Sequence, residues 1–274
     1  MTVTGSRKPT RIGSVEKALA ILDLLVERRA PAGVTEISRT LGFTFSTTHH
    51  LISTLRASGY LDQDPATRKY RLGLGALRLG LVAPDFFDLH SRAGPVLQEL
   101  ALEVNESANL AIFDHLEVVY IQQASSSRPS RMFTRLGARA PLYCTGVGKA
   151  FLASLSPAEA RARFEASRPT RFTGSTVVDW PSLKAELEHI RQLGYALDRE
   201  EREEGVACVA AQVRDASGKV CAAMSVSGPA GRILPRAAEL AAGVMAAAGR
   251  LSSGLGYRPG EPREGWAGPP ALGT

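Results

Sequence analysis

The chain has 274 residues, of which 44% are hydrophobic and 22% are charged. This length favours two domains over one, and the composition is that of an ordinary globular protein rather than a disordered or fibrous one. No apolar run approaches the roughly eighteen residues that a membrane span needs, and residues 1–9 lack the apolar core of a signal peptide. The sequence therefore predicts a cytoplasmic protein that makes no contact with a membrane.

Cysteine usage argues against a disulfide framework. The three cysteines, Cys144, Cys208 and Cys221, are odd in number and scattered, which suits a reducing compartment. Their spacing matches no zinc pattern. We assign no metal site, no cofactor and no catalytic residue.

Positive charge is concentrated at the N-terminal end. The chain carries a net charge of +6, and residues 1–75 account for +5 of it, with eleven Lys/Arg against six acidic residues. The rest of the chain is therefore nearly neutral. Such concentrated positive charge is typical of a module that binds phosphates.

The first elements predicted are two helices. Ser14 is expected to cap the first, and Thr35 a short second helix that Gly42 ends. Apolar residues of the first helix recur at the helical period, which predicts that one face packs on a core. That face comprises Val15, Ala18, Leu19, Leu22, Leu25 and Val26.

A third helix and a hairpin follow. The helix is expected over residues 46–58, and two short strands, 60–63 and 69–72, flank the turn sequence at 64–67. Two helices, a turn, a third helix and a hairpin, in about sixty residues, are the order of a winged helix-turn-helix.

The remaining elements change period at Ser107. Residues 74–105 are predicted to be mainly helical and to link two domains, and strands are expected at 109–113 and 118–121. Three helices, three strands and a terminal helix follow at residues 146–154, 157–167, 182–193, 195–198, 206–213, 220–227 and 235–251.

The third helix is the candidate DNA-reading element. Its apolar face includes Leu51 and Ile52, and its opposite face carries polar side chains that can reach phosphates and base edges in a major groove. These candidates are Ser46, Thr47, His49, His50 and Ser53. In the hairpin, Arg68, Lys69 and Arg71 can contact phosphates, which positions a protein on DNA without reading its sequence.

Two other functions fit parts of this pattern. Winged helices also bind proteins, so the fold alone does not decide for DNA. Gly148-Lys149 could suggest a phosphate loop, but Tyr143 and Ala150 stand where such a loop needs Gly and Ser/Thr. Cys208 as a nucleophile would need a histidine base, and none lies near it in the sequence. An enzyme is therefore not expected.

Two sets of motifs resemble a known family. The first set resembles the DNA-binding domain of IclR-type transcriptional regulators and comprises GSVEKAL at 13–19, STTHHL at 46–51 and KYRLG at 69–73. The second set resembles the effector domain of that family and comprises TGVGKA at 145–150, GYALD at 194–198, EEGVAC at 203–208 and SVSGP at 225–229. Together the motifs follow the family order from about residue 12 to 250.

The resemblance implies an α+β chain in which a winged helix-turn-helix precedes a GAF-like effector domain, a curved antiparallel sheet with helices that binds a small metabolite. Carried over from the family, Gly146 and Val147 would offer backbone amides suited to a carboxylate. Ser225 and Ser227, two apart on one strand, would share a face. The full set of effector-binding residues implied is Ala140, Gly146, Val147, Asp198, Val206, Cys208, Ser225 and Ser227.

Two features depart from the family pattern. His50 stands where arginine is common, which predicts a different operator preference. Ala140 and Val206 stand where leucine also occurs, which favours a roomier site and a larger, aromatic ligand.

The partners expected are double-stranded DNA, a small-molecule effector and a second copy of the chain. One reading helix contacts few base pairs, so a homodimer on a pseudo-palindromic operator near a catabolic operon is expected. Dimer or tetramer, and repressor or activator, stay open. The expected organisation is a flexible N-terminus (1–11), a winged helix-turn-helix (12–73), a helical linker and dimerisation region (74–105), an effector-binding GAF-like domain (106–253) and a disordered tail (254–274).

Overall fold

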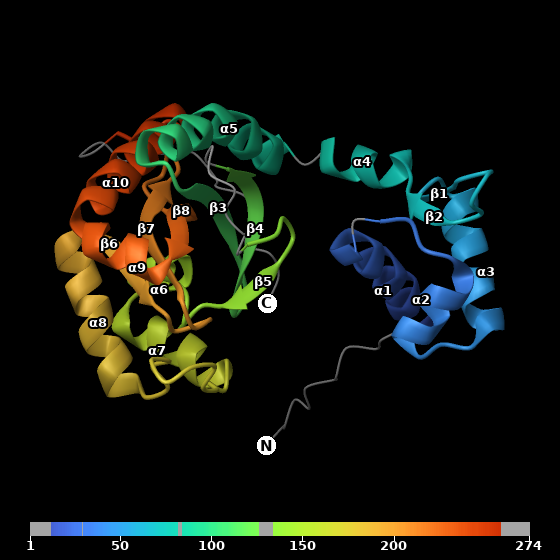
Figure 1. The fold of residues 1–274 in the computed structure, drawn as a ribbon, viewed down its shortest axis with the longest axis horizontal. Helices are drawn as coiled ribbons and strands as arrows, with labels where there is room; N and C mark the ends of the chain where they lie inside the picture. Colours follow the sequence, from blue (N-terminus) through green and yellow to red (C-terminus); the bar gives the residue numbers. More distant parts are fainter. Residues whose placement is uncertain (1–11, 29, 82–83, 126–133, 259–274) are drawn as a thin grey trace, which may run out of the picture. The chain divides into compact units, whose positions relative to one another are not determined.

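The computed structural model describes residues 12–28, 30–81, 84–125 and 134–258. The predicted flexible N-terminus, 1–11, and most of the predicted disordered tail, 259–274, lie outside these residues. The chain divides into two compact units, Met1–Phe87 and Asp88–Thr274. In Figure 1 the first unit runs from blue to teal and the second from green to red.

The first unit is a winged helix-turn-helix, as predicted. Its elements are α1 (Gly13–Arg28), α2 (Val34–Leu41), α3 (Phe45–Ala57), β1 (Leu61–Gln63), β2 (Tyr70–Leu72) and α4 (Leu74–Leu81). Ile21, Ile37 and Ile52 bring the first three helices together in one buried core. The wing is the antiparallel pair β1–β2, in which Leu61 lies opposite Leu72.

The inward face of α1 differs from the predicted one. Ile21, Leu24 and Leu25 are buried. Of these only Leu25 was predicted to face the core, and Leu19, which was predicted to face it as well, is 54% exposed. The helix is apolar over much of its circumference, so two overlapping stripes satisfy the helical period and periodicity cannot choose between them. The apolar face left outside the core comprises the exposed Ile12, Val15, Leu19 and Val26 and the half-buried Leu22.

The starts of two helices also differ from the prediction. Helix α1 begins at Gly13, so Ser14 lies inside it instead of capping it. The cap of α2 is Gly33, whose N–H donates to Glu36 Oε2 at 2.8 Å. Thr35 lies in the first turn of that helix. The carboxylate in the first turn therefore does the capping that was assigned to a hydroxyl.

The second unit is a sheet covered by helices, which confirms the α+β class. Its elements are α5 (Pro84–Val104), β3 (Ser107–Asp114), β4 (Glu117–Ala124), β5 (Arg139–Pro141), α6 (Gly146–Leu152), α7 (Pro157–Ala166), α8 (Trp180–Leu193), β6 (Tyr195–Arg199), β7 (Val206–Arg214), β8 (Val220–Pro229), α9 (Ala230–Ile233) and α10 (Ala237–Gly254). The strand order is β5-β4-β3-β8-β7-β6, with antiparallel neighbours throughout. The edge strand β5 was not predicted, because three residues are too few to show alternation.

The two faces of this sheet are covered by different helices (Figure 1). Helices α5 and α10 pack on one face, where Leu97 and Val244 join Val226 in a buried core. Helices α6, α7 and α8 cover the other face, where Leu152 and Leu187 belong to a second core. Since successive residues of a strand point to opposite faces, each strand serves both cores.

No helix within the described ranges is both long and apolar enough to cross a bilayer. Within the same ranges, no three His, Cys, Asp or Glu side chains gather closely enough to hold a metal ion.

Candidate functional site

The polar face of α3 is free at the surface of the first unit. Ser46, His49, His50 and Ser53 are exposed and Thr47 is half-buried. The Thr47 N–H donates to Thr44 Oγ1 at 3.2 Å, which caps the helix. The opposite face is held in the core by the fully buried Thr48 and Ile52. One side of the helix is therefore packed, and the other can meet a ligand.

Sequence reasoning missed an aromatic residue at the start of α3. Phe45 is 57% exposed and stacks on His49, with 6.2 Å between the ring centroids. An exposed apolar ring beside polar side chains can contact the methyl group of thymine in a major groove. The signal available in the sequence was its place just before the polar face and off the apolar stripe.

The three predicted wing cations are exposed, but they differ in their partners. Arg71 donates twice to Asp62 Oδ2, at 3.1 and 2.8 Å, and Lys69 Nζ lies 3.8 Å from Glu36 Oε2. Arg68 has no carboxylate partner in the part of the chain that the structure describes. Its φ of 59° places it in the left-handed region at the end of the wing turn.

Four polar residues lie side by side across the second face of the sheet. Asp198 pairs with Cys208, Cys208 with Ser227, and Ser227 with Ser107. Directly paired residues of antiparallel strands point to the same face, so these residues form what we call the polar row. Each of them is 7% exposed or less. Ser225 lies two residues along β8, on the same face, and is 2% exposed.

Gly146, the first residue of α6, lies against the polar row. A Cβ atom there would lie 2.5 Å from Cys208 Sγ and 3.6 Å from the Asp198 backbone nitrogen. Only glycine therefore allows α6 to approach the sheet this closely. Val147 follows it, with its side chain fully buried in the core.

The two predicted apolar wall residues lie apart from each other. Val206 begins β7, two residues from Cys208 and therefore on the same face. Ala140 lies on β5, at the opposite edge of the sheet from β6, and pairs with Val118. The structure thus brings Gly146, Asp198, Val206, Cys208, Ser225 and Ser227 together and leaves Ala140 at a distance in strand order.

An asparagine that sequence reasoning missed extends this site. Asn109 is fully buried; its Nδ2 donates to Ser227 Oγ at 3.0 Å, and its Oδ1 accepts from Thr134 Oγ1 at 2.5 Å. Gln123 Nε2 donates to the same threonine hydroxyl at 2.9 Å. Buried polar side chains need such partners, so the network fixes the orientation of Ser227.

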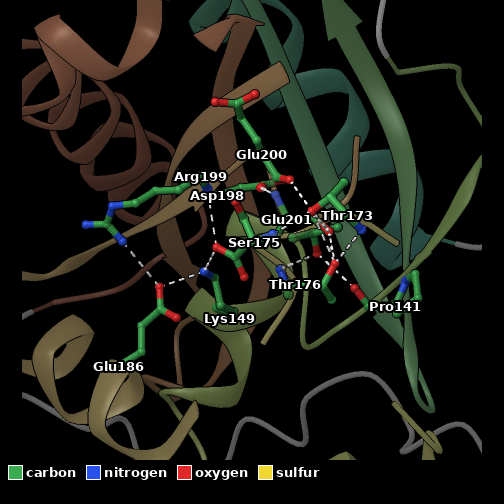
Figure 2. Close-up of polar contacts among 12 residues, drawn as sticks. Pro141, Lys149, Thr173, Ser175, Thr176, Glu186, Asp198, Arg199, Glu200 and Glu201 are labelled. Atoms are coloured by element: carbon green, nitrogen blue, oxygen red, sulfur yellow. Dashed lines mark hydrogen bonds and ion pairs between the residues drawn. The ribbon is translucent and has the colours of Figure 1, made fainter. Parts of the chain in front are cut away.

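A buried lysine adjoins the polar row (Figure 2). Lys149 of α6 is fully buried; its Nζ donates to Glu186 Oε1 at 2.6 Å and also to Glu201 Oε1. The Glu201 N–H in turn donates to Asp198 Oδ1 at 2.8 Å. We call Lys149, Glu186 and Glu201 the Lys149 cluster. It joins α6, α8 and the loop that follows β6.

Two threonines hold the loop that carries Glu201, as Figure 2 also shows. Thr173 Oγ1 donates to the Glu200 carbonyl at 2.6 Å, and Thr176 Oγ1 donates to the Glu201 carbonyl at 2.7 Å. Glu200 has a φ of 61°, which is uncommon for a residue with a side chain. These bonds therefore hold the loop in a conformation that it would rarely adopt alone.

Burial controls the acid–base properties of this region. It raises the pKa of Asp198 from 3.8 to about 7 and the pKa of Cys208 to about 12. Burial lowers the pKa of Lys149, but the charges of Glu201 and Glu186 outweigh it and the pKa of the ammonium is raised. Lys149 is therefore charged at neutral pH, and Cys208 is a neutral thiol, which is a poor nucleophile.

Sequence reasoning examined Lys149 only as part of a failed phosphate loop and missed its glutamate partners. A signal was available, because Lys149 lies in a helical segment that is otherwise Gly, Val, Ala, Phe and Leu. A lysine in such a segment has to be buried and therefore needs an anionic partner.

Both units match models of one protein family. Residues 14–65 match the IclR helix-turn-helix domain, and residues 84–253 match the C-terminal domain of bacterial IclR transcriptional regulators. The chain is also similar to the HTH-type transcriptional regulator XynR of Escherichia coli K12. The two are 38% identical over 216 residues, which cover 79% of this chain and 86% of XynR.

Solved structures agree with these matches. IclR of Thermotoga maritima has a TM-score of 0.73 and 28% identity, covering 90% of this chain and 100% of its own. An IclR homologue of Microbacterium hydrocarbonoxydans, complexed with 4-hydroxybenzoate, has a TM-score of 0.77 and 23% identity. The match covers 88% of this chain and 98% of that one, and it shows that the two share a fold. The chain belongs to the IclR family of bacterial transcriptional regulators and is therefore not an enzyme.

Proposed function

We propose that the chain is a cytoplasmic homodimer that binds an operator near a catabolic operon. A small carboxylate or aromatic acid binds at the polar row and changes the affinity of the dimer for that operator. The observation that carries the proposal is the alignment of Asp198, Cys208 and Ser227 across β6, β7 and β8, in a unit separate from the winged helix.

The chemistry of the proposed effector site suits an acid. Ser225 and Ser227 present hydroxyls that donate as well as accept hydrogen bonds. The side chain of Ser225 is 2% exposed, and its hydroxyl makes no hydrogen bond to another described residue. It is therefore free to bond to a ligand that reaches this face of the sheet. The Gly146 and Val147 amides and the Ala140 and Val206 side chains complete the proposed site.

The proposed DNA interface combines the polar face of α3 with the wing. Ser46, His49, His50 and Ser53 would meet base edges and phosphates, with Thr47 at the edge of that face. Arg68, Lys69 and Arg71 would contact phosphates. Because Arg71 and Lys69 already have acidic partners, Arg68 is the wing cation that reaches a phosphate without breaking an ion pair.

The proposed dimer rests on the apolar seam of α1. Its residues recur at alternating spacings of three and four, which is the pattern that pairs helices in coiled coils. They are Ile12, just before the helix, and Val15, Leu19, Leu22 and Val26 within it. On α4, Leu74 and Leu77 are also more than half exposed. Two paired winged helices would read two half-sites, which supplies the base contacts that one α3 lacks.

Fluorescence anisotropy with promoter fragments from the genomic neighbourhood of the gene tests the proposal. We expect log affinity to fall linearly with log salt, and Arg68→Gln and Arg71→Gln each to lower that slope by about one unit per lost contact, equally on all sequences. Arg161→Gln, in the second unit, should change nothing. The proposal fails if no fragment is retained at low salt, with and without candidate acids.

A further inference from the structure

The Lys149 cluster leaves Asp198 without a cation. Lys149 is shared by Glu186 and Glu201, and Arg199 Nη1 lies 3.6 Å from Glu186 Oε1. These two cations balance the two glutamates. Asp198 itself makes no salt bridge within the part of the chain that the structure describes. It is 7% exposed, and its Oδ1 accepts the Glu201 N–H.

An anion bound at the polar row would meet this carboxyl group. Cys208 and Ser227 follow Asp198 in register across the sheet, so a carboxylate hydrogen-bonded to Ser227 lies near Asp198. Two ionised carboxylates in one buried site repel each other, and one of them takes up a proton. A protonated carboxyl group has an O–H to donate, whereas an ionised one can only accept.

We propose that Asp198 acts in the effector site as a neutral carboxylic acid that donates a hydrogen bond to an anionic effector, so that binding takes up a proton from solvent at alkaline pH, where Asp198 of the free protein is ionised. This inference rests on the proposed effector site and narrows its ligand class. The site favours carboxylates, whose oxygens accept, over amines, whose ammonium groups would require Asp198 to be ionised.

The surroundings of Asp198 favour its neutral form. Burial raises its pKa to about 7, and the charge of Glu201 raises it further, while Lys149 and the backbone N–H groups of Glu201 and Arg202 lower it. The Arg202 guanidinium lies over the ring of Phe172, 4.0 Å from its centroid. An anion placed beside Asp198 would raise the pKa of its carboxyl group further, as the charge of Glu201 does. The titratable groups around Asp198 are Lys149 from α6, Glu186 from α8, Glu201 and Arg202 from the loop after β6, Cys208 from β7, Cys144 before α6 and Tyr120 from β4.

The first experiment needs no ligand. Carboxyl-carbon NMR of the full chain, labelled at aspartate, should show one resonance titrating near pH 7, and Asp198→Asn should remove it. Asp179→Asn is the control, because a backbone hydrogen bond from Ser182 lowers the pKa of Asp179; it should leave that resonance in place. If every aspartate of the wild type titrates below about pH 5, the inference is wrong, whether or not the variant folds.

The second experiment uses 4-hydroxybenzoate as the probe and isothermal titration calorimetry from pH 6 to 8.5. Above pH 7 the wild-type affinity should fall by about tenfold per pH unit, because one proton is taken up. Asp198→Asn carries a permanent N–H donor, so its affinity should not change with pH. Wild-type affinity that does not change with pH would overturn the inference.

The two experiments separate this inference from the proposed function. A wild type that shows the neutral-pH resonance but does not bind 4-hydroxybenzoate at any pH contradicts the aromatic-acid part of the proposed function. A wild type that binds the probe without the resonance contradicts the neutral acid and leaves the effector site standing.

Discussion

Asp198 makes the stability of the second unit depend on pH. Its pKa is about 7 in the folded chain and 3.8 in an ordinary environment. A group whose pKa is raised by folding contributes stability that is fully present below the unfolded value and is lost as the pH rises through the folded value. Stability should therefore fall between about pH 4 and 7.

The variant Asp198→Asn should remove this dependence. It keeps the shape of the side chain and has no charge to bury, so at pH 8 it should be about 2–4 kcal/mol more stable than the wild type. Near pH 4 the two should unfold alike. Urea unfolding at both pH values measures the difference. A variant less stable than the wild type at pH 8 would show that Asp198 is held as an anion.

Lys149 should be essential for the stability of the second unit. Lys149→Met leaves Glu186 and Glu201 without their buried cation, which should cost about 3–5 kcal/mol of unfolding free energy. Glu201→Gln in the same chain should restore part of it. The exposed Lys184, 3.7 Å from Glu188, is the matched control, and Lys184→Met should change little. Equal losses for the two lysine variants would contradict a buried charge network.

At the scale of elements, the exposed seam of α1 predicts where a substitution most weakens self-association. Leu19→Asp places a charge in the middle of the seam and should weaken dimerisation by at least about tenfold, or about 1.4 kcal/mol. Analytical ultracentrifugation measures this, with circular dichroism to show that the helix content is kept. Glu27→Lys, on the same helix but off the seam, is the control. A Leu19→Asp dimer as tight as the wild type would move the interface to residues 74–105.

Periodicity predicted the elements that bury a single face. Helix α3 lies within one residue of its predicted bounds, because its one packed face leaves a single period to read. Strands β7 and β8 are buried on both faces, and they were predicted as short apolar runs on either side of the hairpin turn at 215–218. Helix α1 was assigned the wrong inward face because it is apolar on more than one side. Strand β5 is held by its pairing with β4, which is a tertiary contact that three residues cannot signal.

The candidate site was only partly predictable for a related reason. The alternation along β8 places Ser225 and Ser227 on one face without a structure. The pairing of Asp198 with Cys208 depends on sheet order, which local sequence does not encode. The partners of Lys149 lie 37 and 52 residues away along the chain. No local pattern can pair a helix residue with carboxylates so distant.

At the scale of the whole molecule, the proposed DNA contacts and the proposed effector contacts lie in different units. A change in one should therefore leave the basic competence of the other intact. Asp198→Ala should abolish the response to 4-hydroxybenzoate and keep operator affinity within about twofold of the wild type, or about 0.4 kcal/mol. Gel shifts with and without the acid measure both properties. Loss of both would show that Asp198 supports the whole fold instead of the ligand.

The side chains of strand β8 alternate between the two faces of the sheet in the second unit. Ser225 and Ser227 point to the face that carries the polar row, while Met224 and Val226 pack in the core beneath α5 and α10. An effector bound at Ser227, as proposed, would lie one residue from Val226, which packs beneath α5, the helix that begins at Pro84 and follows the winged helix in the chain. Evolution could therefore alter the strength of the response by exchanging Met224 or Val226, without touching a single atom that recognises the metabolite.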